Sequence, residues 1–305
     1  MNYDLFAIIG PTAVGKTKLA VALAADLNGE IISADSRQLY RGMDLGSGKD
    51  LEEYVYKGKQ IPYHLIDILD AGEKYDLFRF QQDCFEVFRQ IKSRGNQAVL
   101  CGGTGMYIQA ALNREKLLEV PENLALRSEL DNYSQQELNN YLINLNPTQH
   151  NKTDLNDRER TLRAIEIEVY TQQYSDQKEV SPIKNYRIFG IQMPREELRN
   201  RIKTRLKERL KAGMIEEVEQ LVANGVSHQQ LQYYGLEYKF ISLYLQNKLS
   251  NDEMFDALLQ AIRRFAKKQM TWYRRMEKQG FKIDWIDAKL PLEEKLKFIL
   301  SLCAE

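Results

Sequence analysis

The chain has 305 residues, 43% of them hydrophobic and 28% charged, which is typical of a globular protein and excludes a disordered or collagen-like chain. The chain has 43 basic residues (lysine and arginine) and 43 acidic residues (aspartate and glutamate), so its net charge neither favours nor excludes a nucleic-acid partner. The cysteines (Cys84, Cys101 and Cys303) lie far apart, and no apolar stretch reaches the roughly 18 residues of a membrane span, so we expect a cytoplasmic protein without a cysteine-based zinc site or membrane anchor.

The first 105 residues alternate short apolar runs with helical patterns. Each apolar run is bounded by glycine or polar residues, as buried parallel strands are, and the segments between carry apolar side chains at helical spacing. This alternation predicts βαβ units and a parallel sheet flanked by helices, an α/β fold. The expected strands are 5–9, 30–33, 64–68 and 98–101, and the expected helices are 16–27 and 78–93.

The middle of the chain has a different texture. Residues 118–183 are polar, rich in asparagine and glutamine and helical in period, which indicates a helical insertion domain. A strand expected at 186–191 returns the chain to the sheet, and helical patterns continue to Gly280 and again near 292–302. The core domain is therefore predicted to comprise 1–117 and 184–305.

The segment Gly-Pro-Thr-Ala-Val-Gly-Lys-Thr at 10–17 matches G-x-x-x-x-G-K-[ST] between an expected strand and an expected helix, so the fold is of the P-loop type. Its glycines allow successive N–H groups to converge on phosphate oxygens, the lysine adds a positive charge, and the threonine hydroxyl suits Mg²⁺. The predicted diphosphate-binding residues are Gly10, Thr12, Ala13, Val14, Gly15, Lys16 and Thr17, with Thr17 also the metal ligand.

Two further segments bear on the chemistry. The strand at 98–101 is followed by Gly102-Gly103-Thr104-Gly105 and lacks the metal-binding aspartate usual in nucleotide hydrolases. A second glycine-rich segment, 42–50, fails the phosphate-loop spacing and is expected to be a loop, although Lys49 could still contact a phosphate.

Asp35 follows the second strand, at the sheet edge that also carries the phosphate loop. A carboxylate there could hold Mg²⁺, accept a proton from a substrate, or merely cap a turn.

At this point the chain resembles the tRNA dimethylallyltransferase family, also called tRNA isopentenyltransferases. The resemblance covers most of the chain and lies in the phosphate loop, in Ser33 to Gly46, in Gly102 to Tyr107, around Asn156 to Glu166, in Arg201 to Arg209, at Gly235 and in Ala266 to Trp272. It implies transfer of a dimethylallyl group from dimethylallyl diphosphate to the N6 amine of the adenine 3′-adjacent to the anticodon, with the phosphate loop holding the diphosphate.

The resemblance also implies roles for individual residues. Asp35 would accept a hydrogen of the adenine amine, and Thr17 and Arg205 would complete the catalytic set, with Arg205 on the diphosphate. The implied tRNA-binding residues are Asp35, Ser36, Arg37, Gln38, Thr104, Arg127, Glu159, Arg160, Thr161, Leu162, Arg163 and Gly235. We expect a monomer that uses Mg²⁺, binds tRNA and dimethylallyl diphosphate, and contains no zinc.

Residues 263–275 support a polyanionic partner, because six basic residues occur there without an acid and with Trp272 and Tyr273 between them. A solvated helix with core aromatics is the plainer interpretation. Three other functions stay open: an adenylate isopentenyltransferase, a P-loop small-molecule kinase with Asp35 as its base, and a nucleotide-dependent switch.

Overall fold

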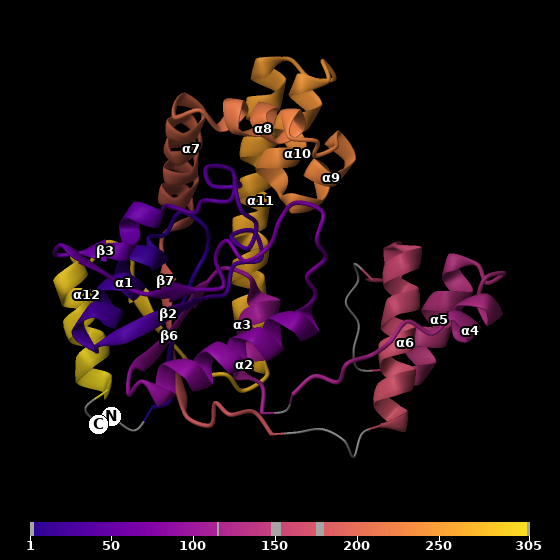
Figure 1. Ribbon diagram of the computed structural model, residues 1–305, viewed down its shortest axis with the longest axis horizontal. Coiled ribbons are helices and arrows are strands. Elements are labelled where there is room, and N and C mark those ends of the chain that lie inside the picture. The colour runs from indigo at the N-terminus through magenta and orange to yellow at the C-terminus, as the bar shows by residue number, and fades with distance from the viewer. Residues whose placement is uncertain (1–2, 115, 148–153, 175–179, 304–305) are drawn as a thin grey trace. The chain divides into compact units, whose positions relative to one another are not determined.

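The computed structural model describes residues 3–114, 116–147, 154–174 and 180–303 (Figure 1). The chain divides into two compact units, which we call the sheet unit (Met1–Arg114 with Ser181–Glu305) and the helical unit (Glu115–Val180). The helical unit was expected at 118–183. The boundary differs because the Ser181 N–H donates to the Arg114 carbonyl at 2.8 Å, which joins the two ends within the sheet unit.

The sheet unit is built on six strands in the order β5-β2-β6-β1-β7-β8, and every pairing between neighbours is parallel. The strands β1, β2 and β6 are largely apolar and buried on both faces, as expected for a parallel sheet covered by helices, with Glu30 and Ser33 as buried polar residues of β2. The strands are β1 Leu5–Ile9, β2 Gly29–Ser33, β5 Tyr63–His64, β6 Gln97–Gly102, β7 Tyr186–Gln192 and β8 Ile283–Asp287.

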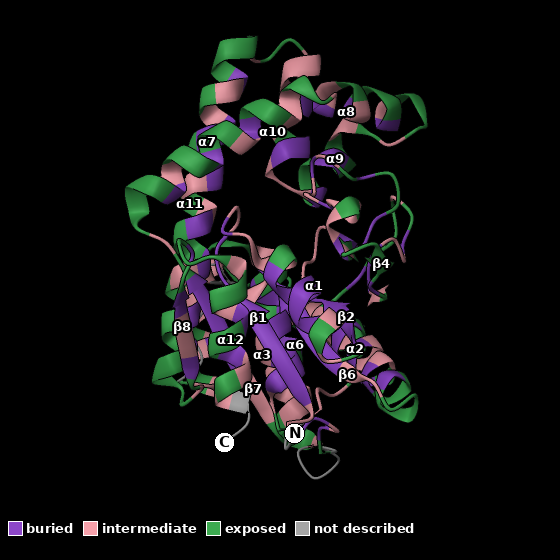
Figure 2. Cartoon of the chain, turned by 90° about the vertical axis from the view of Figure 1, so that its left-hand side faces the viewer, coloured by how far each residue is buried: buried purple, intermediate pink, exposed green. Residues whose placement is uncertain are grey.

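Helices cover both faces of this sheet, and Figure 2 shows their buried sides turned inward. One face packs on α1 and α12, through Phe6 and Ile8 against Leu19 and Leu296. The other face packs on α2, α3 and α11. The helices of the sheet unit are α1 Lys16–Asp26, η1 Leu51–Tyr54, α2 Leu77–Ser93, α3 Gly105–Leu112, α7 Arg195–Lys211, α8 Met214–Ala223, α9 His228–Tyr234, α10 Leu236–Leu245, α11 Asn251–Lys278 and α12 Leu292–Cys303.

The helical unit has a small core of its own. Leu138 and Leu142 of α5 pack against Leu162 and Ile165 of α6, and Ser134 begins α5 with a capping box. Its elements are α4 Leu124–Glu129, α5 Gln135–Leu145, η2 Asp154–Asn156 and α6 Arg158–Gln173. In the described part of this unit no strand is present, in line with the helical period of the sequence.

The strand expected at 64–68 is wrong beyond its first residue. Strand β5 ends at His64, because Leu65 and Asp67 adopt positive φ angles of 61° and 55°, which an extended strand does not allow. Strand β8 and the hairpin of β3 (Val55–Tyr56) and β4 (Lys59–Gln60) were not predicted. Within the described ranges, every helix is too short or too polar to cross a bilayer.

Candidate active site

The phosphate loop lies between β1 and α1, at the carboxyl edge of the sheet. Gly15 caps α1 with φ 93°, a left-handed conformation that suits glycine, and Ala13 also has positive φ. Thr12, Ala13, Gly15, Lys16 and Thr17 line a pocket at this edge. This concave run of backbone N–H groups at a helix N-terminus is suited to an anion.

Two predicted diphosphate residues do not line this pocket. The Val14 side chain is buried in the core beside α1, and the Gly10 carbonyl accepts a hydrogen bond of 3.1 Å from the Tyr273 hydroxyl. Val14 and Gly10 therefore fix the loop through contacts on the side away from the pocket.

Lys16 is a partly buried cation without an ion-paired carboxylate in the described part of the chain. Its Nζ donates to the Pro11 carbonyl at 2.9 Å. Burial lowers the pKa of Lys16, although the nearby Asp35 opposes this shift. A bound anion would give Lys16 the direct ion-pair contact that no described carboxylate provides.

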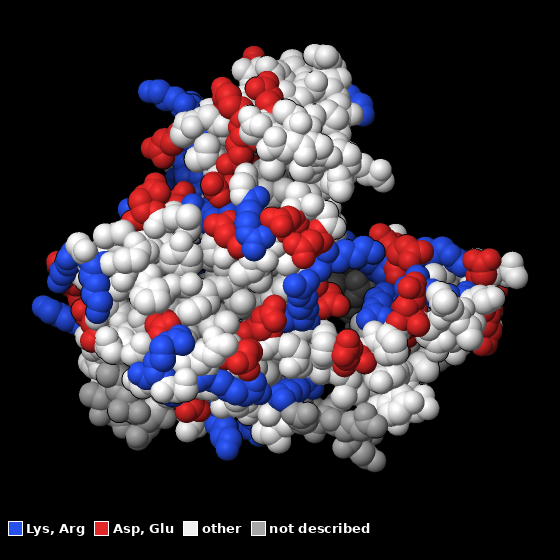
Figure 3. Space-filling model, in the orientation of Figure 1, with Lys and Arg blue, Asp and Glu red and all other residues white. Residues whose placement is uncertain are grey.

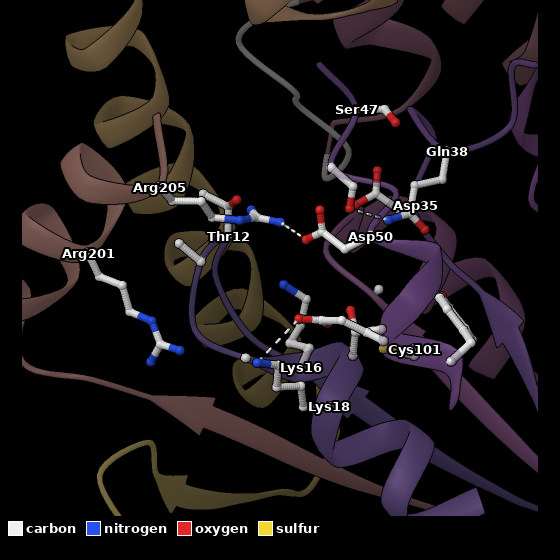
Figure 4. Close-up of a pocket in the computed structure, with 17 residues that line it drawn as sticks. Thr12, Lys16, Lys18, Asp35, Gln38, Ser47, Asp50, Cys101, Arg201 and Arg205 are labelled. Carbon is white, nitrogen blue, oxygen red and sulfur yellow. Dashed lines mark hydrogen bonds and ion pairs between the residues drawn. The ribbon is translucent and has the colours of Figure 1, made fainter. Parts of the chain in front are cut away.

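Helix α7 supplies two arginines to the same pocket, Arg201 and Arg205 (Figure 4). They are four residues apart and therefore share one face of the helix. Arg205 Nη2 lies 2.7 Å from Asp50 Oδ2, and Arg209 Nη2 lies 3.0 Å from Asp50 Oδ1. The prediction from the sequence placed Arg205 at the diphosphate but did not include Arg201 or Asp50. The four-residue spacing between Arg201 and Arg205 is the signal that could have identified Arg201.

Asp35 lines the pocket opposite these arginines (Figure 4). Its Oδ1 accepts from the Arg37 N–H at 3.1 Å, and its second oxygen has no partner in the described chain. Strand β6 lies between β1 and β2, so the segment after it brings Thr104 to the same edge. Thr104 Oγ1 accepts from the Ser36 N–H at 3.0 Å and thereby fixes the turn that carries Asp35.

Gln38 joins this turn to the loop that carries Asp50. The Gln38 Nε2 donates to the Gly48 carbonyl at 3.2 Å, and its Oε1 accepts from the Ser33 hydroxyl at 3.0 Å. The structure therefore gathers Ser36, Gln38 and Thr104 of the predicted tRNA-binding set around Asp35.

Arg37 and Gly235 lie together and are both half-buried, and the Arg37 side chain contacts other protein groups. Arg37 Nη1 lies 3.1 Å from Glu237 Oε2, and its guanidinium stacks 4.4 Å from the centre of the Phe265 ring. A Cβ at Gly235 would lie 3.4 Å from Arg37 Nε. The charge of Arg37 is thus already balanced by the protein.

The remaining predicted tRNA-binding residues belong to the helical unit. Arg127 is ion-paired with Glu159 at 3.0 Å and Glu166 at 2.7 Å, and the hydrogen bond that it donates to Glu166 raises the pKa of Arg127. Arg163 also contacts Glu166, at 3.1 Å.

Their neighbours on α6 divide between surface and core. Thr161 and Leu162 are buried, whereas Arg160 is exposed in the first turn of the helix. Contacts from this helix to tRNA stay a prediction.

The alternative role of Lys49 as a phosphate contact is wrong. Its ammonium is fully buried, lies 2.8 Å from Asp44 and also pairs with Asp67, and it donates to the Tyr40 carbonyl at 2.9 Å. Lys49 therefore holds the 44–50 loop together and does not line the pocket.

Comparison with known proteins bears on the family of the chain. The family model described as IPP transferase matches residues 38–276, and that of isopentenyl transferase matches residues 3–70. The tRNA dimethylallyltransferase 2 of Bacteroides fragilis is 52% identical over 98% of this chain and 97% of its own length. The tRNA dimethylallyltransferase 1 of Parabacteroides distasonis is 53% identical over 97% of this chain and 96% of its own.

Solved structures give the same result. The tRNA isopentenylpyrophosphate transferase of Bacillus halodurans is 34% identical, with a TM-score of 0.72 over 98% of this chain and 95% of that protein. The predicted P-loop-type α/β fold is therefore confirmed. Since one family model spans most of the chain and relatives match it nearly end to end, this chain belongs to the IPP transferase family.

Proposed function

We propose that this chain transfers the dimethylallyl group of dimethylallyl diphosphate to the N6 amine of the adenine 3′-adjacent to the anticodon of tRNA, releasing diphosphate. One observation carries the proposal: a single pocket is lined by the phosphate loop with its unpaired Lys16 and by the carboxylate of Asp35. An anion site and a proton acceptor are the two features that this alkylation needs. The names of the relatives support the same reaction.

The phosphate loop binds the leaving group. When the bond between C1 and the diphosphate oxygen breaks, its electron pair stays on that oxygen and negative charge grows there. Lys16, the N–H groups of the loop and Arg205 stabilise this charge where it develops, which favours the transition state over the bound donor.

The Thr17 hydroxyl and the oxygens of the diphosphate would hold Mg²⁺. These groups fit, because Mg²⁺ prefers oxygen ligands and commonly keeps several waters beside substrate phosphates. Thr17 lines the pocket, and among the described residues no group of three or more histidine, cysteine, aspartate or glutamate side chains offers a full protein site. Bound there, Mg²⁺ would neutralise charge on the diphosphate.

Asp35 prepares the acceptor. The adenine amine is a weak nucleophile because its lone pair is delocalised into the ring. The free oxygen of Asp35 accepts a hydrogen bond from this amine and takes one of its protons as nitrogen bonds to C1. The adenine must leave its stack to reach the pocket, and Ser36, Gln38 and Thr104 would contact it there.

Helix α11 offers a surface for the phosphate backbone of tRNA. Arg264, Lys267, Lys268 and Arg274 are exposed and form no ion pair with any described residue. Elsewhere acidic and basic side chains are intermixed over the face shown in Figure 3. A run of cations without ion-paired partners favours the binding of a polyanion. These four side chains differ in this respect from Arg37 and Arg127, whose charges are balanced by carboxylates of the protein.

The test is an incubation with labelled dimethylallyl diphosphate, Mg²⁺ and either bulk tRNA or AMP. We expect label in tRNA, and label in AMP alone would indicate an adenylate isopentenyltransferase instead. The Lys16→Met variant should lose transfer in both cases. Transfer of phosphate from ATP to an acceptor, without prenyl transfer, would contradict the proposal and favour a kinase.

A further inference from the structure

An acidic side chain stands among the cations of the phosphate pocket. Asp50, just before η1, lines the pocket together with Lys16 and Arg205. Its two oxygens bridge two guanidinium groups, at 2.7 Å from Arg205 Nη2 and at 3.0 Å from Arg209 Nη2. The Asp50 and Arg205 side chains are each 31% exposed, so this pair faces the space that a diphosphate would enter.

Asp50 is ionised at neutral pH. Burial acts to raise the pKa of Asp50, but the positive charges of Arg209 and Arg205 outweigh it and hold the pKa below its ordinary value. Arg205 therefore has a negatively charged partner before any substrate arrives.

The position of Asp50 is built into the loop that carries it. Glu217 accepts from the backbone N–H groups of Asp44 and Gly46, both at 3.0 Å, and anchors the start of the loop on α8. Gly48 has φ 77°, and a Cβ there would lie 2.7 Å from Arg209 Nη2 and 3.2 Å from Arg205 Nη2. A glycine at this point lets both guanidinium groups approach the loop closely.

We propose that Asp50 competes with the diphosphate for Arg205 and so weakens diphosphate binding enough for the product to leave. This inference rests on the proposed function, in which Arg205 binds the departing diphosphate. A diphosphate carries several negative charges, and it must share or take the guanidinium that Asp50 holds. Arg209 keeps the displaced carboxylate on the pocket wall by pairing with its other oxygen.

The opposite role would be that Asp50 merely orients Arg205 for the diphosphate. The two roles predict opposite changes in diphosphate affinity when Asp50 is replaced. Removing a competing charge tightens anion binding, whereas removing an orienting partner weakens it. The ion pair that a diphosphate must displace, two opposite charges 2.7 Å apart near the protein surface, is strong enough that its loss changes affinity by about tenfold or more.

The experiment is calorimetric titration of the full chain with inorganic pyrophosphate in the presence of Mg²⁺. The Asp50→Asn variant keeps the size of the side chain and removes its charge, and we expect pyrophosphate to bind about tenfold tighter. Steady-state turnover should fall and product inhibition by pyrophosphate should increase. Asp70→Asn is the matched control, because Asp70 pairs with Arg41 at 2.9 Å and does not line the pocket.

A double-mutant cycle tests whether Asp50 acts on pyrophosphate affinity through Arg205. In the Arg205→Gln background, Asp50→Asn should change pyrophosphate affinity by less than about threefold, because the contested guanidinium is gone. Unchanged or weaker binding by Asp50→Asn, or a gain that persists without Arg205, would overturn the inference. If Asp50→Asn does not fold, Asp50→Ser replaces it under the same criteria. If the unaltered chain binds no pyrophosphate, the proposed function fails as well.

Discussion

Gln269 of α11 connects the phosphate loop to the segment after β6, and its replacement by leucine tests whether that connection supports the site. Gln269 Oε1 accepts from the Thr12 N–H at 2.9 Å, and its Nε2 donates to the Gly103 carbonyl at 2.9 Å. The residue is only 6% exposed. Leucine has a similar volume but leaves the Thr12 N–H without its partner and the Gly103 carbonyl with only the longer hydrogen bond of 3.4 Å from the Tyr273 hydroxyl.

A buried polar group that loses its partner costs about 1–3 kcal/mol. The Thr12 N–H borders the open pocket, where water can partly replace the lost partner. We therefore expect Gln269→Leu to lower the free energy of unfolding by about 2 kcal/mol and Tm by about 5 °C. Because the loop is loosened, pyrophosphate should also bind several-fold more weakly.

Thermal unfolding and calorimetry measure both effects. Gln109→Leu is the matched control, since Gln109 of α3 bonds Gln279 at 3.1 Å near the surface, and its loss should change stability by less than about 0.5 kcal/mol. If both variants unfold like the unaltered chain, the contact between α11 and the phosphate loop does not support the site.

Three further changes follow from the geometry. Asp35→Asn keeps an acceptor for the Arg37 N–H, so the variant should fold normally. Its turnover should fall at least about a hundredfold, while its affinity for tRNA stays within about tenfold of that of the unaltered chain. Normal turnover in a labelled-donor assay would contradict the role of Asp35. Gly48→Ala should raise KM for dimethylallyl diphosphate several-fold by displacing the arginines beside the loop, whereas Gly58→Ala, with a similar φ of 79° and nothing within 4 Å, should not. Glu30 has its pKa lowered from 4.5 to about 2, chiefly by the hydrogen bond from Arg94 and against the effect of burial. A carboxyl whose pKa is lowered on folding stabilises the folded chain at pH values above its unfolded pKa. Glu30→Gln should therefore lower the free energy of unfolding by on the order of 2 kcal/mol at pH 7, and by progressively less as pH falls from about 4.5 to 2. Unfolding experiments at each pH measure this difference.

The sequence predicted the central strands and the phosphate loop because both are encoded locally. Residues 5–9 form a continuous apolar run, and the glycine and lysine spacing that follows requires one backbone shape. Strand β8 was not predicted because Asp284 and Asp287 interrupt its apolar character. Asp284 is accommodated at the sheet edge by its ion pair with Arg187, at 2.9 Å.

Charge pairing was the part of the site that the sequence could not provide. Asp50 lies 155 positions before Arg205, and no local pattern indicates that the fold brings them together. In the same way, Arg37 and Arg127 are cationic in the sequence, but Glu237 and Glu166 neutralise them in the structure. Such pairs depend on tertiary contacts, so basic residues in a sequence overstate the free positive charge of a surface.

The central claim is that the phosphate loop holds the diphosphate of an isoprenoid donor. Competitive calorimetry with dimethylallyl diphosphate and ATP, each with Mg²⁺, tests it most directly. We predict that dimethylallyl diphosphate binds tighter, that ATP does not displace it at equal concentration, and that Lys16→Met abolishes its binding. Preferential binding of ATP, with transfer of its phosphate to an acceptor, would contradict the account.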